Sequence, residues 1–219
     1  MSAMKSVRLW FSKEGRAVYI SHLDMMRCMQ RALKRAGIPV WYTEGFNPHI
    51  YLTFALPLSL GFASDCESLD VRLVGEMSFD EIVRRMSAAL PMGMCIQRAA
   101  EPNHKPEAIA YADYRLVFRQ ADAAQFLPQW EAFIAQPVIA WNKKTKKGYK
   151  EINLKDYIIS TTAQTEDGDI VVTARLLAGI TENLNPTLLI EAFRKVCDCF
   201  GHVSVRRTAV LDRELLPFE

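Results

Sequence analysis

The sequence lacks the motifs by which nucleotide-dependent enzymes, serine hydrolases and zinc proteases are recognised. Its ten glycines form no G-x-G-x-x-G or P-loop pattern, and neither G-x-S-x-G nor H-E-x-x-H occurs. The five cysteines are odd in number and follow no C-x-x-C or C-x-x-x-C-x-x-C spacing, which argues against a disulfide framework, a zinc site or an iron–sulfur cluster. We therefore expect free thiols, no metal and no cofactor. Cys197 and Cys199 are expected about 200° apart on a helix, where they could not face one ligand.

Long apolar segments are absent as well. No run approaches the roughly 18 residues of a membrane span, and residues 1–10 contain no apolar stretch of the kind found in signal peptides. The net charge is +2 and 24% of residues are charged, which is not the composition of a disordered chain. These features predict a folded cytoplasmic protein that does not enter a membrane, in which any electrostatic signal is local.

What is present is enough apolar sequence, 50% of 219 residues, for one large domain or two small ones. In the first half, alternation and capping signals predict strand, helix, strand, strand, helix and strand in that order. The expected elements are Ser6–Phe11, Ser21–Gly37, Val40–Thr43, Glu67–Val74, Ser78–Leu90 and a strand from Met94. This order is typical of a ferredoxin-like unit, in which two helices cover one face of an antiparallel sheet.

The second half repeats this pattern after a polar segment, Glu101–Glu107, which we expect to be a linker because it contains two prolines. The expected elements are Tyr114–Phe118, Asp122–Ala135, Val138–Trp141, Ile158–Ala163, Ile170–Leu177, Pro186–Phe200 and Val203–Val210, with a hairpin turn at Asp167–Gly168. The sequence thus predicts an α+β protein made of two tandem ferredoxin-like (βαββαβ) units, residues 1–100 and 108–219. Gly148–Lys155 fits this pattern loosely.

The most informative stretch runs from Tyr19 to His49 and holds two of the four histidines. Ser21 with Asp24 three residues later forms a helix-capping pattern, and glycine and proline end the helix. Apolar residues at helical spacing predict a core face formed by Met26, Met29, Leu33 and Ala36. The opposite arc is cationic, and its predicted RNA- or phosphate-binding residues are Arg27, Arg31, Lys34 and Arg35.

The Gly45–His49 loop suggests a groove beside this helix. The expected groove residues are Tyr19, His22, Asp24, Phe46, Asn47 and His49. One hypothesis is that both imidazoles, the asparagine and the helix N-terminus converge on a phosphate or a base. The alternative is that Ser21 and Asp24 cap the helix and His22 packs against it. A metal site is disfavoured because only Asp24 and Glu44 lie near enough in sequence to complete the ligand set.

A second basic stretch, Lys143–Lys155, has six lysines against one acid and lies beside Trp141 and Tyr149. Its predicted RNA-binding residues are Lys143, Lys144, Lys146 and Lys147. Cations hold phosphates and aromatic rings stack on unpaired bases, so this composition suits nucleic acid. Such a run can also be only a solvated loop.

Several segments resemble the radical-SAM-linked protein family, a domain of unknown function found beside or fused to cobalamin-binding-type radical SAM proteins. These segments are Phe11–Lys13, Tyr19–Arg27, Arg31–Ala36, Gly45–His49 and Leu56–Gly61. The resemblance implies a radical SAM partner and an RNA-related role. Without a C-x-x-x-C-x-x-C motif the chain is not itself the radical enzyme, and the family offers no catalytic residue to carry over.

The sequence therefore favours a non-catalytic RNA-binding or substrate-presenting accessory protein that acts with a radical SAM enzyme. One alternative is a metal-independent endoribonuclease in which His22 and His49 are the catalytic acid and base. Another is a protein-interaction module that docks its partner through an exposed apolar segment, Ile50–Leu60.

Overall fold

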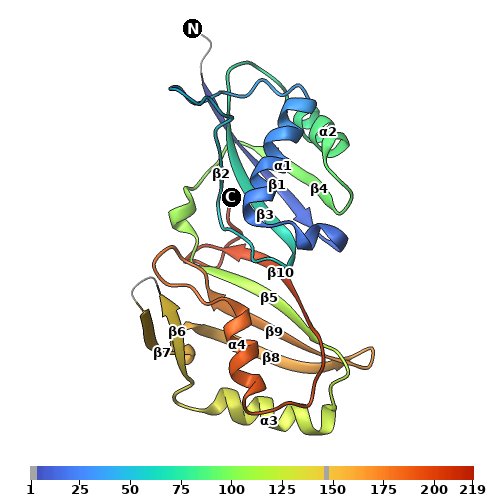
Figure 1. The fold of residues 1–219 in the computed structure, drawn as a ribbon, viewed down its shortest axis with the longest axis vertical. Helices are drawn as coiled ribbons and strands as arrows, with labels where there is room; N and C mark the ends of the chain where they lie inside the picture. Colours follow the sequence, from blue (N-terminus) through green and yellow to red (C-terminus); the bar gives the residue numbers. More distant parts are fainter. Residues whose placement is uncertain (1–3, 146–147) are drawn as a thin grey trace. The chain divides into compact units, whose positions relative to one another are not determined.

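The computed structural model describes residues 4–145 and 148–219 and has the α+β class that the sequence predicts (Figure 1). It divides into two compact units. The first is Met1–Ala108 together with Phe218–Glu219, and the second is Ile109–Pro217. The expected linker, residues 101–107, therefore packs with the first unit, and the last two residues of the chain return to that unit.

The sheet of the first unit is antiparallel, with strands in the order β4-β1-β3-β2. Its strands are β1 (Lys5–Lys13), β2 (Leu52–Phe54), β3 (Ala63–Leu73) and β4 (Met94–Ala100). Alternation along β1 directs Val7, Leu9 and Phe11 into the core, where all three are buried.

Two helices cover one face of this sheet, α1 (His22–Arg35) and α2 (Phe79–Ala89) (Figure 1). Helix α1 contains no β-branched residue and is capped by Ser21, whose Oγ accepts the Asp24 N–H at 3.2 Å. It ends where Gly37 adopts a φ of +62°. Short 3₁₀ helices, Gly15–Tyr19 and Pro106–Ala108, complete the unit. The buried stripe of α1 is Met25, Met29, Ala32 and Leu33, so the predicted core face is displaced toward Met25.

The predicted strand Val40–Thr43 is wrong. Val40 forms an isolated β-bridge with Leu73, and Tyr42 forms another with Ile50. Because the two residues pair with different parts of the chain, the segment does not form a continuous strand. The second strand of the sheet is Leu52–Phe54, because its two end residues are buried while Thr53 is exposed, and this alternation matches the register of β3.

The sheet of the second unit has the order β10-β5-β9-β8 and is also antiparallel. Its strands are β5 (Tyr111–Phe118), β8 (Ile158–Glu166), β9 (Asp169–Leu177) and β10 (Val203–Leu211). The helices are α3 (Ala123–Ala135) and α4 (Pro186–Arg194). Phe118 of β5 lies in ring contact with Phe126 and Trp130 of α3 and Phe193 of α4, so both helices pack against one face of this sheet. The Asp167–Gly168 turn joins β8 to β9 with both residues at positive φ, as predicted.

The predicted strand Val138–Trp141 does not join the sheet of the second unit. Instead, β6 (Ala140–Thr145) pairs with β7 (Gly148–Asn153) in a separate two-stranded sheet, followed by a 3₁₀ helix, Leu154–Tyr157. The first four residues of β7 are exposed, so this sequence has no apolar face to bury in the sheet.

Helix α4 is shorter than predicted, because it ends at Arg194 and not at Phe200. The Arg194 guanidinium lies over the Phe200 ring and donates to the Phe200 and Gly201 carbonyls, which fixes the chain after the helix as a turn. Cys197 and Cys199 lie in this turn and not on the helix, so the predicted angle between them around a helix does not apply. Burial, together with the neighbouring Cys197 thiol, raises the pKa of Cys199 to about 12.

Candidate functional site

The N-terminal turn of α1 is held by interactions among its own residues. The Ser21 hydroxyl donates to Asp24 Oδ2 at 2.8 Å, and Arg27 donates to Asp24 Oδ1 at 3.1 Å. The hydrogen bond from Ser21, followed by that from Arg27, lowers the pKa of Asp24. Asp24 and Arg27 thus complete the cap. The positive charge of Arg27 is partly neutralised by Asp24, so Arg27 is less available to an anionic ligand.

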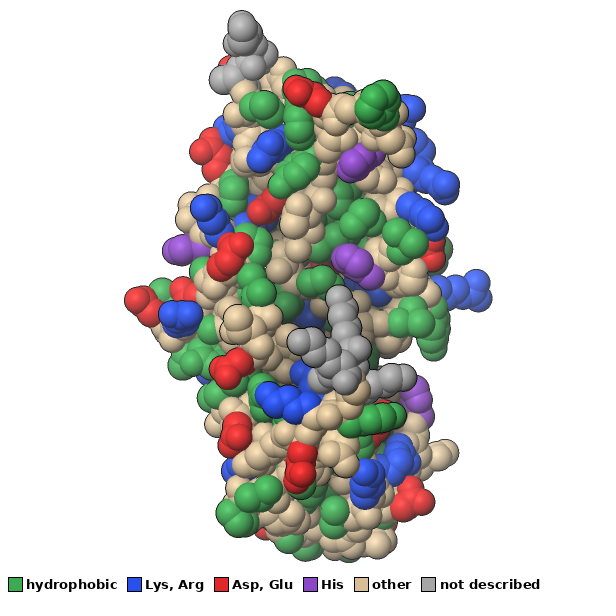
Figure 2. All heavy atoms as spheres, turned by 60° about the vertical axis from the view of Figure 1, so that its left-hand side comes forward, with side chains coloured by type: hydrophobic (Ala, Val, Ile, Leu, Met, Phe, Trp, Pro, Cys, Tyr) green, Lys and Arg blue, Asp and Glu red, His purple; other side chains and the backbone are tan. Residues whose placement is uncertain are grey.

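Further along the cationic face, the predicted residues divide into two kinds. Arg35 donates to the Ala89 carbonyl at 2.7 Å and so closes the C-terminal end of α2. Arg31 and Lys34 are exposed, and in the described part of the chain their side chains make no hydrogen bond or ion pair. Figure 2 shows Lys and Arg side chains gathered along one edge of the molecule in the view. Two cations on α1 are therefore available to an anionic ligand.

The Gly45–His49 loop presents an aromatic side chain and uses its histidine internally. Phe46 is fully exposed, at 112% relative accessibility. His49 Nδ1 lies 3.1 Å from Thr43 Oγ1 and 3.1 Å from the Asn47 carbonyl, while its backbone N–H donates to the same threonine hydroxyl. Gly45 adopts a φ of +116°, which its lack of a side chain allows. The hydrogen bonds of His49 therefore close the loop.

His22 lies in a different environment from His49. Its ring packs edge-on against Phe54, with centroids 5.2 Å apart, and it lines a small pocket. Across residues 4–145 and 148–219, no hydrogen bond or ring contact joins His22 with His49. Tyr19, another predicted groove residue, is 74% exposed and does not line the pocket.

The pocket beside His22 contains two buried charged side chains that the sequence analysis missed. Lys13 and Glu67 are each 3% exposed, and both line the pocket together with the apolar side chains of Phe11, Ile20, Met25, Phe54 and Leu58. Lys13 Nζ donates to the Ile20 carbonyl at 3.2 Å. Burial lowers the pKa of Lys13, against an opposing effect from Glu67. The alternation of β1 could have indicated that Lys13 is buried, because residue 13 continues the series of buried positions 7, 9 and 11.

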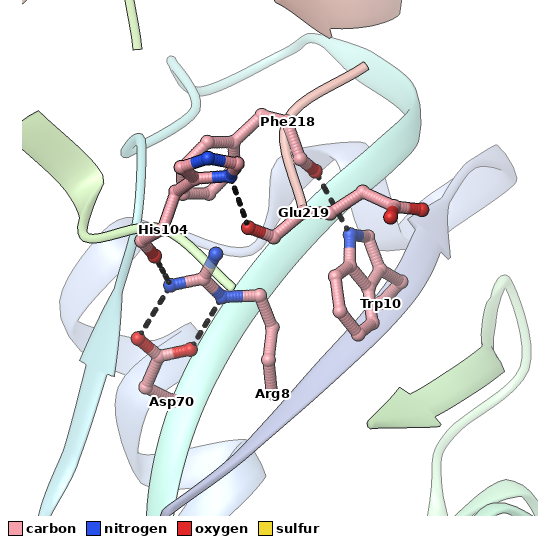
Figure 3. Close-up of polar contacts among 6 residues, drawn as sticks. All are labelled: Arg8, Trp10, Asp70, His104, Phe218 and Glu219. Carbon is pink, nitrogen blue, oxygen red and sulfur yellow. Dashed lines mark hydrogen bonds and ion pairs between the residues drawn. The ribbon is translucent and has the colours of Figure 1, made fainter. Parts of the chain in front are cut away.

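Another buried charge in the first unit is Arg8, whose side chain is fully buried. It donates to both carboxylate oxygens of Asp70, at 2.7 and 2.8 Å, and to the His104 carbonyl at 2.9 Å (Figure 3). The Phe218 ring covers its guanidinium at 4.3 Å, and Trp10 donates to the Phe218 carbonyl. These contacts hold β1, β3 and the returning end of the chain together, so Arg8 has a structural role.

The lysine-rich stretch forms the β6–β7 hairpin of the second unit. Lys143 lies opposite Lys150 and its Nζ donates to the Asn183 carbonyl at 3.3 Å. Lys195 lies over the Trp141 ring at 3.9 Å, which the sequence did not indicate. Lys144 is placed only through its backbone pairing with Tyr149, and the predicted Lys146 and Lys147 lie outside the described residues.

Two kinds of feature are absent from the described residues. No three His, Cys, Asp or Glu side chains among them are placed to hold a metal ion. None of the helices they form has the length and apolar content needed to cross a membrane.

Residues 6–186 match a bacterial family described as "Uncharacterized protein conserved in bacteria (DUF2344)". The chain belongs to this family. No curated protein matches it in sequence. Among solved structures, it is similar to an unknown protein from Galdieria sulphuraria at 15% identity, covering 94% of this chain and 99% of that one with a TM-score of 0.27. A protein provisionally described as a glycine cleavage system transcriptional repressor is similar at 14% identity, with 94% and 98% coverage and a TM-score of 0.25. These scores are too low for either to inform the fold or function of this DUF2344 member.

Proposed function

We propose that the protein binds single-stranded RNA through the cationic face of α1 and acts as a non-catalytic accessory protein. The observation that carries the proposal is the pair Arg31 and Lys34, whose side chains are exposed and make no hydrogen bond or ion pair within the described residues. Unpaired cations one turn apart on a helix suit the spacing of a phosphate backbone. They lose little free energy when phosphate replaces the water around them.

The Gly45–His49 loop adds an aromatic contact to this surface. Gln30 of α1 donates to the Ile50 carbonyl at 3.1 Å and so ties the end of the loop to the helix. Phe46 is fully exposed and Tyr42 is 44% exposed, so both can stack on unpaired bases. A second cationic surface on the β6–β7 hairpin, with Lys150 and Tyr149 exposed, offers the same combination in the second unit.

The test is fluorescence anisotropy with a labelled single-stranded RNA at several salt concentrations. Each phosphate neutralised contributes a slope of about −0.7 to the plot of log K against log salt. Replacing both Arg31 and Lys34 with alanine is therefore expected to make the slope shallower by about 1.4. Arg84→Ala is the matched control, because Arg84 is 70% exposed but already paired with Glu81 at 2.7 Å. Absence of RNA binding, or an unchanged slope in the double variant, would refute the proposal.

We also propose that the fold consists of two versions of one ferredoxin-like βαββαβ unit. In support, the first unit has the sheet order β4-β1-β3-β2, and the second has the equivalent order β10-β5-β9-β8 with the β6–β7 hairpin inserted. Each unit also has a bidentate Arg–Asp pair at directly opposed positions of equivalent strands, Arg8 with Asp70 and Arg175 with Asp113.

The proposed partner is a radical SAM protein, and the proposed location is the cytoplasm. The partner is supported by the resemblance of segments between Phe11 and Gly61 to the radical-SAM-linked family. Affinity purification of the tagged protein from its native host, with and without nuclease, tests this proposal. Co-purification that resists nuclease is expected. Recovery without any radical SAM protein would count against it.

The two alternative functions gain no support. A ribonuclease using His22 and His49 needs both imidazoles at one phosphodiester, whereas the described contacts engage His22 with Phe54 and His49 with Thr43. Of the proposed docking segment Ile50–Leu60, the residues Ile50, Leu52 and Phe54 are buried in the core, which leaves a smaller apolar surface that includes Leu60, 62% exposed.

A further inference from the structure

Strand β8 lies at one edge of the sheet of the second unit. Among the described residues, β9 is its one strand partner, and no other backbone group is hydrogen-bonded to it. The Asp167–Gly168 turn has two residues, so the pair that flanks it, Glu166 and Asp169, is hydrogen-bonded, and such pairs alternate along an antiparallel ladder. The N–H and C=O groups of the intervening positions therefore point away from β9. These positions are Thr161, Ala163 and Thr165.

This edge has few of the features that commonly keep exposed strands from pairing with another chain. Such strands are often very short, or carry lysine or proline. Strand β8 has nine residues, contains neither lysine nor proline, and is rich in isoleucine and threonine. Its register irregularity, between Ile158 and Ser160, lies at its start, and the pairing is regular from there to the turn. The strand is therefore able to accept a further strand along most of its length.

A groove runs beside this edge, between α3 and β8 (Figure 1). Its volume is about 530 Å³, which lies within the usual range of about 300–1,000 Å³ for ligand sites. Its apolar walls include Leu127, Trp130 and Ile134 of α3 and Ala163 of β8. Side chains alternate between the two faces of a strand. A peptide paired with β8 would therefore direct every second side chain into this groove.

The lining of the groove indicates which peptide it suits. Lys155 lines it, donates to the Ile134 carbonyl, and makes no ion pair within the described residues. Because a lysine ammonium group has three N–H donors, a carboxylate on the peptide is complementary to it. Glu131 also lines the groove, but it is exposed, so solvent screens its charge more strongly.

A second copy of β8 is a poor occupant of the groove. The side chains that line the groove from β8 are threonine and alanine, and a second copy would contribute the same small groups. Such groups would fill little of a space of about 530 Å³. Neither a nucleic acid nor a lipid has the repeating N–H and C=O groups that pair with a strand edge. A peptide of different sequence, with large apolar side chains, satisfies both the edge and the groove.

We propose that the groove between α3 and β8 binds an extended segment of a partner protein, which adds to the sheet as a further strand. Large apolar side chains of this segment alternate into the groove, and an acidic side chain lies beside Lys155. The site goes beyond the proposed function, because it belongs to the second unit and does not depend on RNA binding by α1.

The ligand for the test comes from a displayed library of random peptides of about ten residues, the upper length of common strands, selected on the full-length chain. The selected peptides are expected to carry large apolar residues at every second position, an acidic residue near one end, and no proline between them. Failure to enrich any peptide, or enrichment of peptides without this alternation, would overturn the inference.

One selected peptide is then synthesised in two forms, each methylated on a different alternate set of backbone nitrogens. Only every second N–H of an added strand faces β8. One form should therefore bind the wild-type protein at least about tenfold more weakly than the unmodified peptide, and the other should retain its affinity. Equal affinities of the two forms would show that the peptide does not pair with the edge, and the inference would fail.

The role of Lys155 is tested on the peptide. Replacing its acidic residue with the corresponding amide should weaken binding to the wild type by up to about fivefold, the range for an exposed ion pair. The same replacement should have no effect on binding to Lys155→Ala. An equal loss with both proteins would refute the place of the acidic residue beside Lys155.

Two protein variants locate the site. Ala163→Arg places a long charged side chain in the groove and should abolish peptide binding. Gln164→Arg is the matched control, because it makes the same change at the next position, which faces the other side of the sheet, and it should bind the peptide as the wild type does. Peptide binding that survives in Ala163→Arg would overturn the inference. If that variant fails to fold, the two methylated forms on the wild type still decide.

The RNA affinity of the same proteins separates this inference from the proposed function. Ala163→Arg and Gln164→Arg each add one positive charge, so any change in RNA affinity should be the same in both. Peptide binding without RNA binding would support this inference and refute the proposed function. RNA binding without peptide binding would do the reverse.

Discussion

Replacing Asp70 with asparagine tests the strongest electrostatic claim of the structure, that the buried Arg8 depends on one carboxylate. Asparagine keeps the shape of the side chain but removes the charge that compensates a fully buried guanidinium. Loss of one partner of a buried pair costs roughly 3–5 kcal/mol. The Asp70 side chain is 22% exposed, and the Phe218 ring over Arg8 remains in place, so we expect the lower end, about 3 kcal/mol.

The second unit supplies the control. Asp113 and Arg175 pair with almost the same geometry, 2.7 and 2.8 Å, at directly opposed strand positions, but their side chains are 26% and 30% exposed. Water therefore reaches both charges, and we expect Asp113→Asn to cost only about 1 kcal/mol.

Hydrogen exchange followed by mass spectrometry at increasing urea concentrations measures the stability of each unit separately. Asp70→Asn should lower protection in peptides from residues 4–108, and Asp113→Asn should lower it less, in peptides from residues 109–217. Similar losses in the two units, or a loss below about 1.5 kcal/mol for Asp70→Asn, would refute the reasoning that burial sets the cost.

Two further predictions concern the surroundings of the pocket. Gly93 has a φ of +86°, and an added Cβ would lie 2.4 Å from the Glu14 carbonyl oxygen, whereas Gly61 has a φ of +85° with nothing within 4 Å. Gly93→Ala should therefore destabilise the protein by about 1 kcal/mol or more beyond Gly61→Ala in urea unfolding, and equal costs would show that the close approach is relieved. The second prediction concerns Lys13, whose pKa in the folded protein lies below its ordinary value of 10.5. Between these two pKa values the unfolded chain holds a proton that the folded protein has lost. The stability of the wild type relative to Lys13→Met should therefore rise as the pH increases toward 10.5 and should fall as the pH drops through the folded pKa. Urea midpoints at pH 8, 9 and 10 measure this difference, and a constant difference would show that Lys13 is not desolvated.

The sequence by itself determined the features that depend on neighbouring residues. Ser21, Ser78 and Asp122 cap helices as predicted, because each side chain accepts a backbone N–H two or three residues away. The Asp167–Gly168 turn was predictable because an Asp-Gly pair readily adopts the two positive φ angles that a tight hairpin turn needs. The cationic arc of α1 also follows from helical spacing alone, since its residues lie within one helix.

The tertiary structure decided which of those cations are available and where the buried charges lie. Arg35 is held by Ala89, 54 positions later, and Arg8 by Asp70, 62 positions later, so no local pattern could show that these charges are occupied. The pocket is formed in the same way, because Lys13, His22 and Glu67 come from β1, α1 and β3 and meet only when the strands pair and the helix packs on them. Local hydrogen bonds fix caps and turns, whereas strand pairing and burial depend on contacts between distant parts of the chain.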